Sequence, residues 1–563
     1  MAAFDRLVDM WGPKMANDDN WCVDRSAALA QVRAGFWGTQ SLTDVIRSNA
    51  DRKPSDPAVI SSGHRLSWSG YNDFSAQLAG ALLSLDLARG DRIGIQIADG
   101  PAVHCALVAA EMAGLTAVGL GARAGSREVE YLLGSTGAKA VISLESNRGT
   151  SAKAWVQDMQ SRNVAIGHHV IVPDIAEPGG RVEIDGQPWS VRNSEPSHPS
   201  IDSRRFGPNE LFMINSTSGT TGMPKKVMQF QNRWFYYRQL VNQAIELGGD
   251  DVFMSVVPAP FGFGLWTSHF VPAISGIPVV VMDRFTPEGA LELIEREGVT
   301  VMACVSTQFI MMLNSPRMAA TSFKSLRAIF TGGETVPYHR AVEFEQVTGA
   351  KVLQFYGSNE TGAYSFTKSS DSAEDRLTTC GRTIDEMNPA LFDVDGRDIT
   401  GSGGPGQPGC KGPACCAGYY DDPEGNSGLY TSDGWMLMED VATIDDRGYV
   451  RLTGRASDFI IRGGKNISAV NIETSVGTHP SVALAAAVPV PDEVFGEKVG
   501  VFIELHADAS LTLEELATYL TDFGVSRETI PEHMFIVDEL PRSAGGKIAK
   551  GELRAEARRR RLR

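Results

Sequence analysis

A run rich in glycine and hydroxyl groups near the middle of the chain has the residue types that wrap phosphate oxygens. Residues 216–226 read Ser-Thr-Ser-Gly-Thr-Thr-Gly-Met-Pro-Lys-Lys and follow the strand-like segment 210–215. Glycines let backbone N–H groups turn toward an anion, hydroxyls add donors, and lysine adds charge. The run is not a Walker loop, because Pro224 stands where glycine, lysine and serine or threonine are needed. A flexible linker is the alternative, but the flanking apolar and aromatic residues favour phosphate binding.

The segments around this loop have the rhythm of an α/β fold. Short apolar runs such as 92–97 and 278–282 alternate with helix-length amphipathic stretches such as 287–297. Residues 299–305 and 328–330 are expected to form buried parallel strands. Loops after such strands are where an α/β protein places its functional groups.

Changes in composition divide the chain, whose 563 residues exceed what one hydrophobic core organises. We expect an N-terminal domain over 1–455, with α/β subdomains to about 380 and a β-rich subdomain at about 381–453, where glycine and proline break all periodicity. Residues 456–563 are expected to form a compact α+β domain.

Charge and cysteine usage exclude several classes of protein. Lys and Arg number 52 against 68 Asp and Glu, and the net charge of −16 argues against nucleic-acid or anionic-membrane binding. Seven cysteines without a CxxC pair suggest neither a disulfide framework nor a zinc ribbon. The acidic first residues are unlike a secretory peptide, and the longest apolar stretch, 270–282, is broken by proline and glycine. We therefore expect a cytoplasmic protein.

Five ordered motifs between about residues 41 and 554 resemble those of the adenylate-forming superfamily, which includes acyl- and aryl-CoA synthetases, peptide-synthetase adenylation domains and beetle luciferases. They are the loop 216–226, the acidic motif 356–362 (Tyr-Gly-Ser-Asn-Glu-Thr-Gly), Asp433-Gly-Trp followed by Glu439-Asp440, the segment 454–468, and 541–548 (Pro-Arg-Ser-Ala-Gly-Gly-Lys-Ile). The resemblance implies two α/β subdomains plus a small β-barrel, and a mobile C-terminal α+β domain with its hinge near Ser457.

The family's reaction joins a carboxylate to ATP, releases pyrophosphate and leaves an acyl-adenylate that a second nucleophile attacks. The resemblance implies catalytic roles for Thr217, for Glu360, which would hold Mg²⁺, and for Lys547, which would bridge the carboxylate and the α-phosphate. Two anions must meet, so cationic groups must neutralise the charge developing at phosphorus.

The resemblance also implies a set of nucleotide contacts. The predicted ATP- and AMP-binding residues are Thr217, Ser218, Gly219, Thr220, Thr221, Gly222, Lys225, Gly333, Glu334, Tyr356, Gly357, Asn359, Asp440 and Arg455. Asn359 replaces the usual threonine, and Met438-Glu439 replaces the usual Thr-Gly before the ribose-binding aspartate. We place that aspartate at Asp440, by its distance to Arg455, and reject Asp433.

The segments that line the acyl and thiol pockets in the family are aromatic and uncharged here. The predicted acyl pocket comprises Phe261, Phe263, Trp266, Ser306, Gly332 and Phe355, and the predicted CoA tunnel comprises Phe261, Gly463, Gly464 and Lys465. An α-ammonium group would find no carboxylate partner, which disfavours amino acids. Phe355 stands where the family often has glycine, so its bulk favours a compact cyclic, aromatic or medium-length acid. For Phe263 and Trp266, ordinary core packing is an equal alternative.

The leading hypothesis is an acid–thiol ligase, an AMP-forming acyl-CoA synthetase that uses ATP, Mg²⁺ and CoA. One alternative passes the acyl group to a carrier-protein pantetheine or an amine, and another is a catalytically silent nucleotide or acyl-CoA binding protein. The presence of Glu360, Arg455 and Lys547 argues against a protein without catalytic activity. The expected partners are small molecules, namely the carboxylic acid, ATP and CoA, without nucleic acid or a membrane span, and a homodimer is left open.

Overall fold

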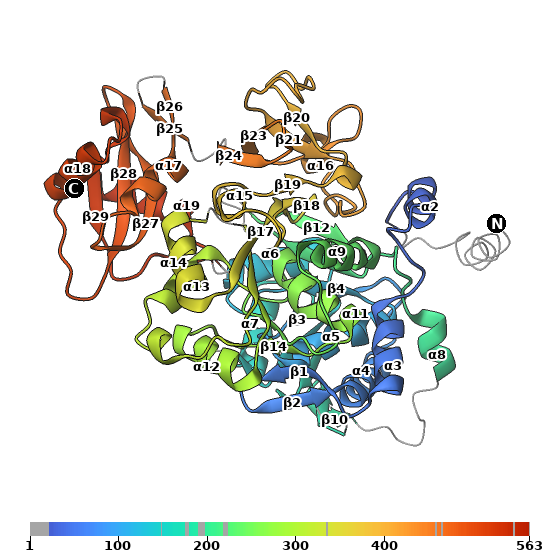
Figure 1. The fold of residues 1–563 in the computed structure, drawn as a ribbon. Helices are drawn as coiled ribbons and strands as arrows, with labels where there is room; N and C mark the ends of the chain where they lie inside the picture. The colour runs from blue at the N-terminus through green and yellow to red at the C-terminus, as the bar shows by residue number, and fades with distance from the viewer. Residues whose placement is uncertain are drawn as a thin grey trace.

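The computed structural model describes residues 22–147, 149–174, 179–189, 198–217, 223–333, 336–455, 459–462, 465–543 and 547–561. Two large, mainly parallel sheets dominate the N-terminal part, and a smaller unit containing the last strands and helices lies beside them (Figure 1). Within the described residues, no helix is both long and apolar enough to cross a bilayer.

An eight-stranded sheet carries the phosphate-loop motif. Its order is β10 (Gln187–Trp189), β9 (Val182–Ile184), β8 (His168–Val172), β5 (Ala140–Leu144), β3 (Arg92–Gln96), β4 (Thr116–Gly119), β11 (Met213–Ser216) and β12 (Lys226–Gln229). The five strands from β8 to β11 are parallel, whereas β12 returns antiparallel to β11. The loop motif therefore joins the two strands of a hairpin.

A nine-stranded sheet carries the acidic motif. Its order is β19 (Arg382–Thr383), β18 (Gly362–Phe366), β17 (Lys351–Ser358), β16 (Ala328–Thr331), β15 (Val301–Ala303), β13 (Phe253–Ser255), β14 (Val279–Val281), β1 (Pro57–Ser61) and β2 (His64–Ser67). Strands β15 and β16 are buried and parallel, with Val301 opposite Ala328, which confirms the prediction for these segments. The acidic motif follows at the turn between β17 and β18.

Helices cover the two sheets and fill the space between them. They are α2 (Arg25–Arg33), α3 (Leu42–Arg52), α4 (Trp68–Leu83), α5 (Pro101–Ala113), α6 (Ser126–Thr136), α7 (Ala152–Ser161), α8 (His198–Arg204), α9 (Gln231–Ala244), α10 (Gly262–Gly264), the π-helix η1 (Leu265–Phe270), α11 (Val271–Ser275), α12 (Pro287–Glu297), α13 (Ser306–Leu313), α14 (Tyr338–Thr348), α15 (Ala373–Thr378) and α16 (Pro423–Leu429). Every residue of α5 is buried, and this helix belongs to the hydrophobic cluster that also contains residues of both sheets.

Helix α12 shows how local sequence sets these boundaries. The Thr286 side chain accepts a hydrogen bond from the Gly289 N–H, and Pro287 occupies the first turn. The helix ends at Gly298, whose φ of +62° is the left-handed conformation that glycine adopts without strain. The predicted helix over 287–297 is confirmed.

The region from 381 to 455 contains two small sheets. One is β20 (Ala390–Phe392), β21 (Gln407–Cys410) and β22 (Met436–Leu437), and the other is β23 (Asp440–Ile444) with β24 (Val450–Arg455). A bridge between Gly406 and Ala442 connects them. The mixed α/β fold class is confirmed by the two large sheets and their helices, and none of the described sheets closes into a barrel.

The C-terminal unit has a sheet of its own. Its strands are β26 (Lys465–Ser468), β25 (Phe459–Arg462), β28 (Gly496–Leu505) and β27 (Val482–Asp492), with β29 (His533–Ile536) parallel to β28, and its helices are α17 (Ala469–Val476), α18 (Leu513–Asp522) and α19 (Lys550–Arg561). These strands pair among themselves, whereas β24 pairs with β23. The predicted hinge residue Ser457 lies outside the described residues.

Candidate active site

A cavity of about 900 Å³ opens where the large sheets meet the C-terminal unit. Its walls include Thr217 after β11, Gly332 and Gly333 after β16, and Tyr356 at the end of β17. These positions lie at the carboxyl ends of parallel strands, where α/β proteins bind ligands. The cavity thus brings together residues from all five sequence motifs, which are far apart in the chain.

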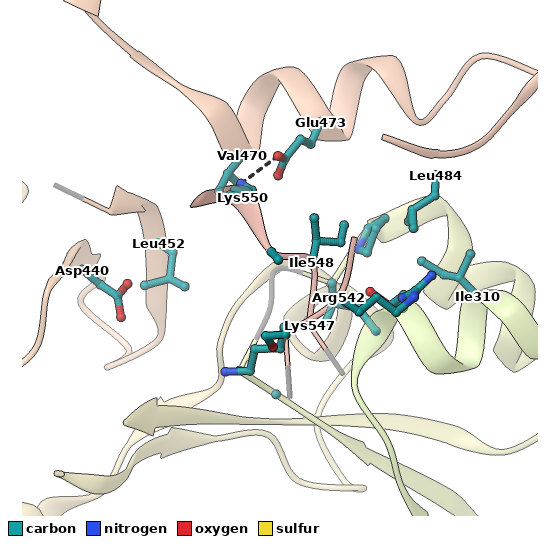
Figure 2. Close-up of a pocket in the computed structure, with 18 of the residues that line it drawn as sticks. Ile310, Asp440, Leu452, Val470, Glu473, Leu484, Arg542, Lys547, Ile548 and Lys550 are labelled. Atoms are coloured by element: carbon teal, nitrogen blue, oxygen red, sulfur yellow. Dashed lines mark ion pairs between the residues drawn. The ribbon is translucent and has the colours of Figure 1, made fainter. Parts of the chain in front are cut away.

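Lys547 reaches this cavity from the C-terminal unit (Figure 2). A Cβ atom on Gly333 would lie 2.8 Å from both Cε and Nζ of Lys547, so the lysine side chain rests directly against this glycine. The segment is fixed by a bridge between Arg542 and Ile548 and by the Ser543 N–H, which donates to the Lys547 carbonyl at 2.7 Å. Lys547, the lysine predicted to be catalytic, therefore belongs to the C-terminal unit and contacts the N-terminal part of the chain at Gly333.

Tyr356 and Asp440 form a buried pair on one side of the cavity. The Tyr356 hydroxyl donates to Asp440 Oδ2 at 3.0 Å, and burial together with this carboxylate raises the pKa of Tyr356 well above its usual range. Asp440 stands opposite Arg455 in the register of β23 and β24. Asp433, the rejected candidate, is not among the described cavity residues. The Arg455 side chain lies outside what the structure describes.

Glu360 is held by a tyrosine. The Tyr419 hydroxyl donates to Glu360 Oε1 at 2.8 Å, while Oε2 has no protein donor among the described residues. Lys225, exposed at the end of the phosphate-loop motif, lies 4.9 Å from the Tyr419 ring and 3.8 Å from Glu439 Oε1. The carboxylate is thus oriented but retains an oxygen able to ligate a hard cation.

Asn359, which replaces the usual threonine, belongs to a network of amides. Its side-chain N–H₂ donates to Asn215 Oδ1 at 2.8 Å, and the same Asn215 oxygen accepts from Gln229 Nε2 at 2.8 Å. A Cβ on Gly262 would lie 2.5 Å from Asn359 Oδ1, so glycine is required there for close approach. The Asn359 side chain is therefore held by Asn215 on β11 and Gln229 on β12.

A fully buried arginine holds the backbone of the same motif. The Arg233 guanidinium, on α9, donates to the carbonyls of Asn359 at 3.0 Å and Glu360 at 3.2 Å, and to Ala414 at 2.7 Å. Gln229 Oε1 accepts a further bond from it at 2.6 Å. A buried charge is tolerated only when it is hydrogen-bonded in this way. Arg233 therefore fixes the turn that carries Glu360.

Residues 218–222 of the glycine-rich loop 216–226 lie outside the described residues. Thr217, the second residue of this loop, lines the cavity, and its hydroxyl accepts a hydrogen bond from the Lys225 N–H at 3.3 Å. The predicted sites that the structure does not describe are Ser218, Gly219, Thr220, Thr221, Gly222, Glu334, Gly463 and Gly464, together with the side chain of Lys465.

Four of the six residues predicted for the acyl pocket line the cavity, and two of them are aromatic. Phe261, Ser306, Gly332 and Phe355 line it, whereas Phe263 and Trp266 are not among the described lining residues. Trp266 instead packs behind Phe355, with ring centroids 5.0 Å apart, and Phe366 stacks on the same ring at 5.4 Å. A Cβ on Gly332 would lie 2.2 Å from the Phe355 carbonyl oxygen, so these strands meet only through glycine.

Several residues of the site carry no signal in the sequence. Arg233 and Tyr419 act on the acidic motif from distant elements, and neither stands in a recognisable motif. Additional cavity-lining residues are Arg123, Arg127, Thr307, Ile310, His339, Arg340, Glu473 and Thr474. The last two come from α17, so the C-terminal unit supplies part of the wall.

The described site combines a glycine-rich hairpin loop, an acidic turn, a buried Tyr–Asp pair and a lysine from a second unit. The sequence profile described as AMP-binding enzyme matches residues 46–420, and the AMP-binding enzyme C-terminal domain matches residues 471–547. The chain belongs to the AMP-binding enzyme family.

Relatives and solved structures agree with this assignment. The medium-chain fatty-acid–CoA ligase of Escherichia coli (strain K12) is 29% identical over 543 residues, covering 95% of this chain and 93% of the relative. A salicyl-AMP ligase / salicyl-S-ArCP synthetase of Mycobacterium tuberculosis (strain ATCC 25618 / H37Rv) is 28% identical over 539 residues, covering 94% and 92%. The crystal structure of the anthranilate CoA ligase AuaEII in complex with anthranoyl-AMP has a TM-score of 0.81 at 19% identity, covering 93% and 98%.

These findings confirm the sequence prediction of the superfamily, of the fold class and of an AMP-forming ligase of the acyl-CoA synthetase class. The chain is therefore an adenylate-forming ligase.

Proposed function

We propose that this enzyme activates a compact cyclic, aromatic or medium-length carboxylic acid as its acyl-adenylate and then transfers the acyl group to CoA. In the first step a carboxylate oxygen attacks the α-phosphorus of ATP, and pyrophosphate leaves. In the second step the CoA thiol attacks the acyl carbon, a thioester forms and AMP leaves. The observation that carries the proposal is the convergence of Lys547 and Phe355 on one cavity.

Four polar residues of the cavity wall would each have a role in the adenylating step. Lys547 would neutralise the charge that develops between the carboxylate and the α-phosphate, as a positioned cation does at low dielectric. Tyr356 would flank the adenine, and Asp440 suits a pair of ribose hydroxyls because a carboxylate accepts two hydrogen bonds. Thr217 and the rest of the loop would donate to the phosphates.

The residues at the acidic turn suit Mg²⁺. A hard cation prefers carboxylate oxygen and usually binds through one or two carboxylates plus substrate phosphates. Glu360 offers this carboxylate, with Oε1 oriented by Tyr419. Bound there, Mg²⁺ would neutralise the phosphate charge.

The aromatic end supports the compact acid. Phe355 is 7% exposed, and Trp266 and Phe330 pack against it at 5.0 and 5.1 Å, so the ring cannot swing away without displacing core residues. A long straight chain would need the space these rings occupy, whereas a flat ring can stack on Phe355.

In the proposed transfer to CoA, the C-terminal unit rotates relative to the N-terminal part of the chain. We propose that residues 456–563 rotate about Ser457 and bring Gly463, Gly464 and Lys465 to the thiol tunnel, with Phe261 as its gate. Phe261 lies in the cavity wall and is half-buried, which is consistent with a side chain that contacts two ligands in turn.

A second candidate function, delivery to a carrier-protein pantetheine, is favoured by the salicyl-S-ArCP synthetase relative.

Incubation with ATP, Mg²⁺ and a panel of carboxylic acids, with and without CoA, tests the function. We expect AMP together with a CoA thioester from ring-bearing acids. Adenylate without thioester would favour the carrier-protein acceptor, and absence of turnover with every acid would contradict the enzymatic proposal. Greater activity on palmitate than on any ring-bearing acid would contradict the compact pocket.

Variants of two stacked phenylalanines distinguish a ring that lines the cavity, Phe355, from a ring that only packs against it, Phe366. We expect Phe355→Ala to raise the ratio of kcat/KM for a long straight acid to that for a ring-bearing acid by about tenfold or more, because it removes the ring at the cavity end. Phe366→Ala removes the ring stacked behind it, outside the described cavity wall. Both variants should lose about 3–5 kcal/mol of unfolding free energy. An equal shift of specificity in both would contradict the assignment of Phe355.

A further inference from the structure

Two cysteines behind the acidic turn lie in contact. Cys410 is the last residue of β21 and is fully buried, and Cys415 follows in the loop 411–416, half-buried. Their Sγ atoms are 3.8 Å apart, and Cys415 Sγ also lies 3.9 Å from the Cys410 carbonyl oxygen. The two sulfurs would have to move closer from this distance to about 2.05 Å, the S–S bond length of a disulfide.

The electrostatics of the pair favour a reactive thiol at Cys415. The hydrogen bond with Cys410 lowers the pKa of Cys415, while the same contact and burial raise the pKa of Cys410. Burial raises the pKa of Cys105, Cys380 and Cys416 to about 12. Since the thiolate is the nucleophile, a partly exposed thiol with a lowered pKa reacts first.

The loop that carries Cys415 is bonded to the turn that carries Glu360. The Cys416 N–H donates to the Glu360 carbonyl at 2.7 Å, and the Ala414 carbonyl accepts from Arg233 Nε at 2.7 Å. A Cβ on Gly362 would lie 2.5 Å from the Ala414 carbonyl oxygen. A displacement of Cys415 therefore moves two direct partners of the acidic motif.

We propose that Cys410 and Cys415 are a reversible oxidation site, at which hydrogen peroxide closes an intramolecular disulfide and slows adenylation. With peroxide, the Cys415 thiolate attacks one oxygen, the O–O bond breaks, and a sulfenic acid and one water form. The Cys410 thiol then attacks the oxidised sulfur, the S–O bond breaks, and a second water leaves. Two thiols lose two electrons and the peroxide gains them.

Closure of the disulfide acts on the site through the loop. Cys410 is held by the ladders that β21 forms with β20 and β22, so Cys415 has to make the approach. The bonds from Ala414 to Arg233 and from Cys416 to Glu360 then strain or break. A shift of about 1 Å in a catalytic group can cost about a hundredfold in rate. The effect on adenylation rests on the proposed function, whereas the formation of the disulfide does not.

Peptide mapping after peroxide treatment of the full chain tests the disulfide directly. Trypsin cuts after Lys411, so Cys410 lies in peptide 398–411, and Cys415 and Cys416 lie in peptide 412–447. We expect these two peptides to be joined after oxidation and separated by dithiothreitol. The link should persist in Cys416→Ser and disappear in Cys415→Ser. A link to Cys416 or to Cys22, or no link while Cys415 is overoxidised, would overturn the proposal.

Activity measured on the same samples tests the consequence. We expect ATP–pyrophosphate exchange to fall by about tenfold or more on oxidation, to recover with dithiothreitol, and to resist oxidation in Cys415→Ser. Cys22→Ala, which removes a partly exposed thiol elsewhere, should remain sensitive. A fall of equal size in Cys415→Ser would overturn the link to activity. If the reduced enzyme shows no exchange at all, the proposed function fails while the mapping still decides the oxidation site.

Discussion

The ammonium group of Lys547 and the backbone of Gly333 occupy adjoining space at the cavity wall. Gly333 has a φ of +75°, and a Cβ there would lie 2.8 Å from the lysine Nζ. A side chain at this position would be strained and would also push the cation out of the site. Through this contact, the glycine turn at Gly333 in the N-terminal part and Lys547 in the C-terminal unit form one continuous stretch of the cavity wall.

Removal of this lysine charge should separate the two half-reactions. We expect Lys547→Ala to reduce ATP–pyrophosphate exchange by about a hundredfold to a thousandfold, because it removes a preorganised cation from the transition state. Attack of CoA on a supplied acyl-adenylate should remain largely intact. Lys498→Ala is the matched control, since this lysine pairs with Asp492 outside the described cavity wall. Unchanged exchange in Lys547→Ala would contradict the assigned role.

At the scale of elements, a buried histidine pair joins α5 to the π-helix η1. His104 Nδ1 lies 3.1 Å from His269 Nδ1, and both side chains are almost fully buried. Burial lowers the pKa of His104 to about 4 and lowers that of His269 well below its usual range. Both rings are therefore neutral in the folded protein at neutral pH.

This pair makes the fold sensitive to acid. In the unfolded chain both histidines titrate near 6.5, so below that pH the unfolded state binds protons that the folded state does not. The free energy of unfolding should therefore fall as the pH drops from about 6.5 to 4, by about 3 kcal/mol for His104 alone. Urea unfolding at pH 7 and at pH 5 measures the slope. We expect His104→Asn to flatten it and the exposed control His64→Asn to leave it unchanged, and an unaltered slope in His104→Asn would contradict the account.

The sequence predicts elements well where the hydrophobic period is strong. Helix α12 has a cap, a proline and a closing glycine, and β15 and β16 are continuous apolar runs, so local signals agree with the fold. The direction of Trp266 could not be predicted, because η1 is a π-helix and its wider turn changes which residues face the cavity. The side chain packs behind Phe355 and does not line the described cavity wall.

Arg233 shows a second limit of sequence reasoning. An arginine within a helix is most often solvent-exposed, yet this one is fully buried by carbonyls of residues 359, 360 and 414. Those acceptors lie more than a hundred residues away in the chain, and only the tertiary fold brings them together. Motifs predict roles for Glu360 and Lys547 because a motif is a local pattern of the chain, whereas the contacts that support the acidic turn come from distant residues.

At the scale of the molecule, one face of the cavity belongs to a unit whose strands pair only among themselves within the described residues. Lys547 is delivered by this unit, and α17 adds Glu473 and Thr474 to the same wall (Figures 1 and 2). With Lys547 against Gly333, the arrangement suits the adenylating step. For the thiol step of the proposed function, we expect Lys547 to withdraw as residues 456–563 change from this arrangement to a second one.

Restriction of the proposed hinge should therefore spare the first step and slow the second. Proline fixes φ near −65° and removes the conformational freedom that a rotation needs. In Ser457→Pro we expect ATP–pyrophosphate exchange within about threefold of the parent, and single-turnover thioester formation slower by about a hundredfold. Ser457→Ala, which keeps that freedom, should behave as the parent in both assays. Equal losses in both steps of Ser457→Pro would indicate general damage to the fold, and unchanged thioester formation would show that the unit does not turn about this residue.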